Sequence, residues 1–124
     1  MTYSKAYDKF PEHTLELETQ PGIARATFQG ELIAESKNAM RLHEGKYPAT
    51  FYFPQEDVRM DLLQKTSHST HCPFKGDASY WSIGSEPGPG ENAVWGYESP
   101  FEQMLGLKDL LSFYADRVDI EGGD

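Results

Sequence analysis

The side chains best suited to chemistry lie in the middle of the chain, around its single cysteine, Cys72. His71 precedes this cysteine and Lys75 follows it, and a nearby cation lowers the pKa of a thiol and favours the nucleophilic thiolate. Asp57 and His71 are the other candidate catalytic residues, because a carboxylate or an imidazole can act as a base. A lone cysteine also packs well as a small apolar side chain, so a structural role for Cys72 stays open.

Cations and aromatic rings near this cysteine predict a binding site. Cations bind an anionic group, and rings stack on a planar or apolar one. The predicted ligand-binding residues are Asp57, Arg59, His71, Cys72, Lys75, Tyr80, Trp95 and Tyr97. The alternative is that these rings belong to the core of two neighbouring strands, where Trp95 and Tyr97 share one face and Trp81 points away from the face of Tyr80.

These residues favour a protein that binds a small anionic molecule, such as a nucleotide or another phosphorylated or carboxylated metabolite. They do not decide whether the molecule is turned over. The competing hypothesis is a non-catalytic module whose exposed aromatic and acidic surfaces dock a protein partner or a second copy of the chain. A monomer and a homodimer are both compatible with the sequence.

Metal-binding patterns are weak in this sequence. One cysteine can form neither an internal disulfide nor a four-thiolate zinc site. A zinc site on His68, His71 and Cys72 would strain the chain, because two of these ligands are adjacent. Asp57 and Asp61 could share one helix face and hold Mg²⁺, or they could stabilise a helix N-terminus. We therefore expect no cofactor. A divalent metal ion is possible, but no other pattern in the sequence supports one.

The balance of charge excludes several classes of protein. The 124 residues include 20 acidic and 11 basic side chains, a net charge of −9, which disfavours broad nucleic-acid binding. No apolar stretch predicts a membrane span or a secretory signal, and we expect a cytoplasmic protein. Residues 37–75 carry six basic and four acidic side chains and sum to +2, whereas the rest sums to −11. Folding could gather this segment into a basic pole.

Short alternating segments predict a mainly β, single domain over residues 13–120. A flexible arm is expected at residues 1–12 and a frayed tail at 121–124. The expected strands are residues 13–18, 24–28, 31–36, 39–43, 50–53, 78–83, 93–97, 110–114 and 117–120.

The connections between these strands have their own signals. Gln29-Gly30 predicts a hairpin, which continues as a meander into residues 39–43. Residues 54–63 predict one or two helical turns that begin at a proline. The other expected connections are an ordered loop over 66–77, a hairpin tip over 84–90 and a short helix over 101–105.

Three motifs occur in order along the chain: Phe53-Pro-Gln-Glu-Asp-Val58, Thr70-His-Cys-Pro-Phe-Lys-Gly76 and Trp95-Gly-Tyr-Glu-Ser-Pro100. This arrangement resembles a bacterial family known as domain of unknown function 427, over about residues 13–119. The resemblance implies a compact, mostly β domain, similar to the folded-sheet "tent" of the Mss4-like group.

The same resemblance implies two properties that the residues do not support. Mss4-like proteins often hold zinc on two pairs of cysteines, whereas Cys72 is alone. The family also carries a nucleotidyltransferase-like label, and such enzymes need a Gly-Ser loop followed by two carboxylates one residue apart to hold metal. Gly84-Ser85 is the only Gly-Ser pair, and no Asp-x-Asp sequence follows it.

Overall fold

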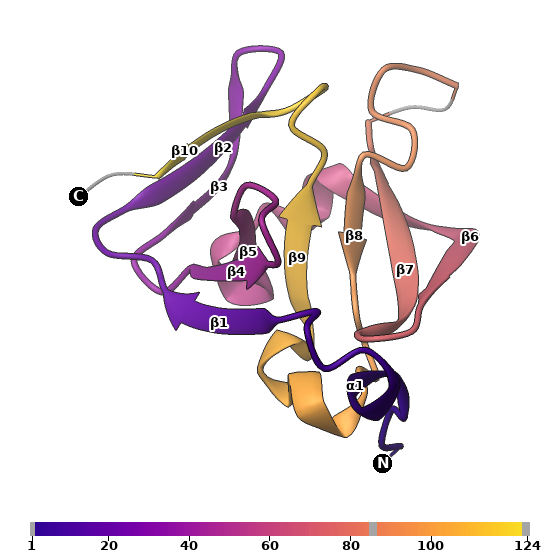
Figure 1. Ribbon diagram of the computed structural model, residues 1–124. Coiled ribbons are helices and arrows are strands. Elements are labelled where there is room, and N and C mark those ends of the chain that lie inside the picture. The colour runs from indigo at the N-terminus through magenta and orange to yellow at the C-terminus, as the bar shows by residue number, and fades with distance from the viewer. Residues whose placement is uncertain (1, 85–86, 123–124) are drawn as a thin grey trace.

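Two antiparallel sheets form the protein, in a computed structural model that describes residues 2–84 and 87–122 (Figure 1). The larger sheet has, in spatial order, the strands β1 (Leu15–Thr19), β4 (Met40–Glu44), β5 (Thr50–Pro54), β9 (Leu110–Phe113), β8 (Val94–Gly96), β7 (Gly76–Ile83) and β6 (Leu63–Cys72). The smaller sheet has the order β10 (Asp119–Gly122), β2 (Ala24–Phe28) and β3 (Glu31–Ser36). The mainly β prediction is therefore confirmed.

Short helical segments connect the strands. They are α1 (Ala6–Lys9) and the 3-10 segments η1 (Gln55–Asp57), η2 (Met60–Leu62) and η3 (Glu102–Leu107). The first two 3-10 segments match the turns expected within residues 54–63, and η3 matches the short helix expected near residue 101. In Figure 1, α1 and η3 lie together at one end of the molecule. Among the described residues, no helix is long and apolar enough to cross a membrane.

The hairpin predicted at Gln29-Gly30 is present, and the meander predicted beyond it is wrong. Gln29 and Gly30 have φ angles of 50° and 84°, the left-handed pair that a tight two-residue hairpin requires. β4 then leaves this sheet and pairs with β1 and β5. The chain changes direction at Ser36, whose hydroxyl accepts a hydrogen bond from the backbone of Asn38 and donates one to Asp57.

The ordered loop expected over residues 66–77 is also wrong, because this segment forms most of β6 and the start of β7. The two strands pair from Leu63 with Ile83 to Cys72 with Gly76. β6 lies at the edge of the sheet, and most of its side chains are exposed. A polar edge strand lacks the alternation of apolar residues that would have identified it.

The two faces of the larger sheet carry different core clusters. Phe53, Trp81, Val94 and Leu111 pack against small residues of β2 and β3 on one face. On the other face lies a second cluster, which we call the aromatic face: Leu42, Tyr52, Ala78, Tyr80, Tyr97, Met104 and Leu107, with Tyr7, Leu15, Leu17, Cys72, Trp95, Leu110 and Tyr114 against them. The predicted opposite orientation of Trp81 and Tyr80 is confirmed.

The ends of the domain are described in part. Residues 121 and 122 belong to β10, whereas residues 123 and 124 of the expected frayed tail lie outside the described residues. Residues 85 and 86 of the expected hairpin tip also lie outside them. The tent architecture implied by the Mss4-like resemblance stays a prediction.

The close packing of β8 against β9 gives a test of this arrangement. A Cβ atom built on Gly96 would lie 2.5 Å from the carbonyl oxygen of Leu110 and 2.9 Å from Leu111 Cδ2. We expect Gly96→Ala to lower the free energy of unfolding by about 1–3 kcal/mol, because backbone has to move. Urea unfolding measures this loss.

Gly106→Ala is the matched control. Its Cβ would meet only the end of the Leu17 side chain, at 2.7 Å, and that side chain can turn away. Equal losses in the two variants would contradict the close packing of β8 on β9.

Candidate functional site

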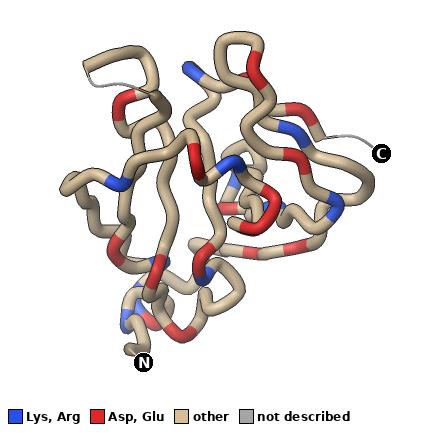
Figure 2. Tube along the Cα trace, turned by 180° about the vertical axis from the view of Figure 1, so that it is seen from behind, with Lys and Arg blue, Asp and Glu red and all other residues tan. Residues whose placement is uncertain are grey.

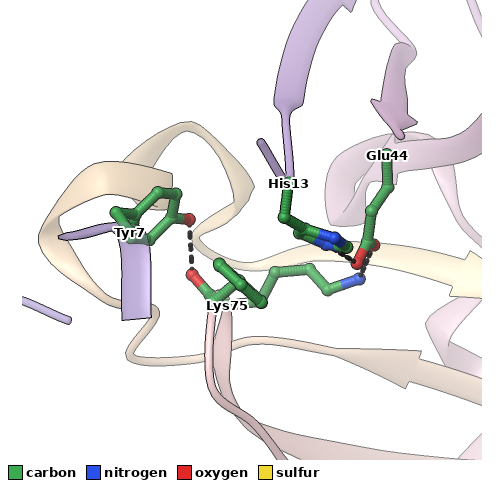
Figure 3. Close-up of polar contacts among 5 residues, drawn as sticks. Tyr7, His13, Glu44 and Lys75 are labelled. Atoms are coloured by element: carbon green, nitrogen blue, oxygen red, sulfur yellow. Dashed lines mark hydrogen bonds and ion pairs between the residues drawn. The ribbon is translucent and has the colours of Figure 1, made fainter. Parts of the chain in front are cut away.

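A carboxylate with two nitrogen partners lies at the edge of the aromatic face (Figure 3). Glu44 Oε1 accepts a hydrogen bond from Lys75 Nζ at 2.7 Å, and Glu44 Oε2 lies 2.8 Å from His13 Nε2. The side chain of Lys75 is only 14% exposed. Burial disfavours the ionised carboxyl of Glu44, but the hydrogen bonds from Lys75 and His13 outweigh it, so the pKa of Glu44 lies below its usual value.

The N-terminal segment and the turn between β6 and β7 hold this network in place. Tyr7 Oη donates a hydrogen bond to the carbonyl oxygen of Phe74 at 2.6 Å, and Ser4 donates one to the carbonyl of Pro73. The ring of Phe74 stacks on His13, with centroids 4.3 Å apart. These contacts attach the N-terminal segment to the domain. The predicted flexibility of residues 1–12 concerns motion, and it stays a prediction.

Tyr7, His13 and Glu44, the other members of this network, are not among the site residues that the sequence predicts. Strand alternation places Leu15 and Leu42 on core faces, and that pattern was visible. The pairing that sets His13 beside Glu44 was not, because it comes from the register of β1 on β4, in which Leu15 lies opposite Glu44. Only the folded sheet brings Lys75 to the same point.

Four rings, from the three strands β5, β7 and β8 and from the segment after β9, form a connected group, which we call the ring group: Tyr52, Tyr80, Trp95 and Tyr114. The centroids of Trp95 and Tyr114 are 4.5 Å apart, those of Tyr52 and Trp95 6.3 Å, and those of Tyr80 and Tyr114 6.5 Å. Tyr52 and Tyr80 are buried, whereas Trp95 and Tyr114 are partly exposed. A ligand can therefore reach only Trp95 and Tyr114 without a rearrangement of the core.

Two further side chains flank the ring group. The guanidinium carbon of Arg117 lies 5.2 Å from the centre of the Tyr114 ring, within the range of a cation–π contact. The ring of His68 lies 4.5 Å from that of Tyr80 at a steep angle. Arg117 and Tyr114 are not among the site residues that the sequence predicts, because both lie beyond the three motifs.

The hydroxyl groups of this face are neutral hydrogen-bonding groups. Burial raises the pKa of Tyr7 and of Tyr114 to about 12, and it raises the pKa of Tyr52 and Tyr97 well above the usual range. Tyr80 Oη lies 2.9 Å from Thr70 Oγ1 and 3.3 Å from Tyr114 Oη. The raised pKa values of Tyr7, Tyr52, Tyr97 and Tyr114 keep these four phenols protonated near neutral pH, so they cannot serve there as bases.

The structure brings five of the eight predicted ligand-binding residues to the aromatic face or its edge. Tyr80, Trp95 and Tyr97 belong to its cluster, and the half-buried Cys72 packs against it. Lys75 reaches the edge of this face through Glu44. Residues of two motifs that are separated in sequence, Thr70–Gly76 and Trp95–Pro100, are thus neighbours in the fold.

The other three predicted residues lie elsewhere. Asp57 accepts a hydrogen bond from Ser36 at 2.6 Å, and Arg59 pairs with the exposed Asp61 at 2.8 Å, both beside β3. His71 lies on the opposite side of β6 from Cys72, with Nδ1 2.7 Å from Asp77 Oδ1. Asp57 and Arg59 therefore do not face the rings.

The basic residues of segment 37–75 are not gathered into one pole. Arg41 pairs with Glu18 and Lys65 with Glu98, in addition to the Arg59 and Lys75 pairs already described. Figure 2 shows Lys and Arg dispersed along the chain among Asp and Glu. Among the described residues, no three His, Cys, Asp or Glu side chains are grouped so as to hold a metal ion.

Removal of the Glu44 charge tests the network. We expect Glu44→Gln to lower the free energy of unfolding at pH 7 by about 1–2 kcal/mol, because Lys75 and His13 lose a partly solvent-screened partner. A lowered carboxyl pKa stabilises the fold above the usual value near 4.5 and loses this effect as the pH falls. The difference between variant and wild type should therefore shrink below that pH in urea titrations.

Glu35→Gln is the matched control, because Glu35 pairs with Arg25 on the surface, where both side chains are well exposed. We expect a change of at most about 0.5 kcal/mol. A Glu44→Gln effect as small as this, or one that is independent of pH, would contradict the described network.

Comparison with known proteins gives a family and no activity. No curated protein matches the chain. The model of one family, described as a domain of unknown function (DUF427), matches residues 16–123, which includes all three motifs. The chain therefore belongs to the DUF427 family.

Proposed function

We propose that this protein binds a small anionic molecule with a planar or apolar body, such as a nucleotide or a carboxylated metabolite, on the exposed part of its ring group. The observation that carries the proposal is the contact of two partly exposed rings, Trp95 and Tyr114, beside the guanidinium of Arg117. A planar ligand would stack on the rings, and its anionic group would lie against the guanidinium.

The rings favour binding because they are already held in place. Trp95 and Tyr114 contact each other, and the buried rings of Tyr52 and Tyr80 support them from behind. A ligand then stacks on rings that lose little side-chain entropy. An aromatic contact of this kind contributes about 0.5–1.5 kcal/mol beyond its buried area.

The cation differs from those predicted from the sequence. Arg59, His71 and Lys75 each have an acidic partner within 3 Å. Arg117 instead donates to the backbone carbonyls of Glu91 and Asn92, and its carboxylate neighbour Asp116 is 3.8 Å away. Backbone contacts orient the guanidinium and leave its charge for an anion.

The proposal covers binding only and assigns no chemical step to Cys72. We place the function in the cytoplasm, where an unpaired thiol stays reduced. We also propose, on the sequence resemblance alone, that the larger sheet is related to the tent of the Mss4-like group.

Adenosine and AMP are a suitable pair of probes, because they share one planar base and differ in the phosphate. We expect AMP, or another mononucleotide in the same panel, to quench the fluorescence of Trp95 and to raise the melting temperature more than its nucleoside does. Trp81 is buried, so quenching reports mainly on Trp95. A ligand at 100 times its dissociation constant stabilises the fold by about 2.7 kcal/mol.

Two variants separate the ring from the charge. Trp95→Leu should abolish stacking of both probes, and Arg117→Gln should remove the advantage of AMP over adenosine. Arg25→Gln, which changes a surface arginine paired with Glu35, should bind as the wild type does. The proposal fails if no mononucleotide or aromatic carboxylate binds, or if Trp95→Leu binds as well as wild type.

A second candidate function is association with another protein chain. Tyr3, Phe10 and Leu105 are 53%, 50% and 40% exposed, and the hollows that they line share Phe101. We expect a protein that self-associates through this surface to sediment as a dimer at high concentration, and Phe10→Ser to return it to a monomer. A wild type that stays monomeric at all concentrations and retains no other protein would exclude this function.

A further inference from the structure

The hollow lined by Phe101 and Leu105 is a cavity that lies away from the ring group, where the end of the β6–β7 hairpin meets the segment before η3. Its volume is about 480 Å³, which is within the range of small-molecule sites. We infer that this cavity binds a small zwitterion with an apolar side chain, namely a free amino acid or a dipeptide. The inference does not rest on the function proposed above.

Two opposite charges line this cavity without pairing with each other. Lys108 forms no ion pair with any acidic side chain that the structure describes, and it lines the cavity together with Asp77. The Asp77 side chain is 79% exposed, and its described polar side-chain partner is His71, on Oδ1. His71, which also lines the cavity, contacts only Oδ1 of Asp77. Among the described residues, Lys108 is thus left to bind a carboxylate, and Asp77 Oδ2 is left to accept a hydrogen bond from an ammonium.

The other carboxylate at the cavity is already occupied. Glu98 accepts hydrogen bonds from Lys65 at 2.7 Å and from Ser79 at 2.8 Å. These bonds, that of Lys65 first, hold the pKa of Glu98 below its usual value. Glu98 is therefore paired with Lys65, and the charged groups left for a ligand are Lys108 and the Oδ2 atom of Asp77.

Apolar side chains form part of the same wall. Phe101 and Pro100 line the cavity, and Leu105 lines it with 40% of its surface exposed. An exposed apolar wall in a cavity that also carries both charges suits the side chain of an amino acid and gives no contact to a purely ionic ligand.

Backbone contacts fix the walls before any ligand arrives. Gly76 has a φ of 118°, and a Cβ built on it would lie 3.3 Å from Pro100 Cα. Phe101 N donates a hydrogen bond to the carbonyl of Lys75 at 3.0 Å, and Glu102 N donates one to that of Thr2 at 2.9 Å. A ligand that binds to walls held in this way causes only a small loss of conformational entropy in the protein.

Amide NMR spectra of the full chain test the inference. We expect L-leucine or L-leucyl-L-leucine to shift the amide signals of Gly76, Ser99 and Phe101. Isoamylamine lacks the carboxylate and N-acetyl-L-leucine lacks the ammonium, so each should bind at least tenfold more weakly. The tighter of the two zwitterions shows whether the site takes an amino acid or a dipeptide.

Charge-removing variants locate the site. Lys108→Met and Asp77→Asn should each weaken binding at least tenfold, whereas Lys37→Met and Asp119→Asn, which do not line the cavity, should not. Trp95→Leu should leave this binding unchanged, which separates it from the ring group. The inference is overturned if neither zwitterion shifts these signals, if an analogue binds as tightly, or if Lys108→Met and Asp77→Asn bind as wild type.

Discussion

The end of the β6–β7 hairpin is the point on which the other parts of this fold depend. Its three turn carbonyls, of Pro73, Phe74 and Lys75, accept hydrogen bonds from Ser4, Tyr7 and Phe101. The side chain of Lys75 then reaches across to Glu44 on β4. A turn of a few residues therefore joins the N-terminal segment, the far side of the larger sheet and the segment before η3, and a buried cation without Glu44 would be costly.

The two-residue period of the strands divides the chemistry of the larger sheet between its faces. On β6, Cys72 packs toward the aromatic face, whereas His71 turns away and pairs with Asp77. Tyr80 and Trp81 separate in the same way. Residues adjacent in a motif thus serve different surfaces, which is why the motif Thr70–Gly76 contributes both to the Glu44 network and to the cavity beside Pro100.

Ion pairs explain why a chain of net charge −9 has no broad basic surface. Most lysines and arginines of residues 37–75 have a carboxylate partner within 3 Å. The partners of Lys65 and Lys75 come from parts of the chain about 30 residues away in sequence, namely Glu98 and Glu44. The excess positive charge of residues 37–75 is therefore largely paired with carboxylates in the folded protein. Outside this segment, Arg117 beside a ring and Lys108 at a cavity have no carboxylate partner within 3 Å among the described residues, so their charge is left for other groups.

The sequence by itself determined the mainly β class, the hairpin at Gln29-Gly30, the helical turns after Pro54 and the opposite orientations of Tyr80 and Trp81, because these depend on local alternation and turn chemistry. Only the tertiary structure decided that β4 joins β1, that His13 and Lys75 share Glu44, and that Arg59 lies apart from the rings. Those outcomes depend on strand order and register, and no local pattern specifies which distant strands become neighbours.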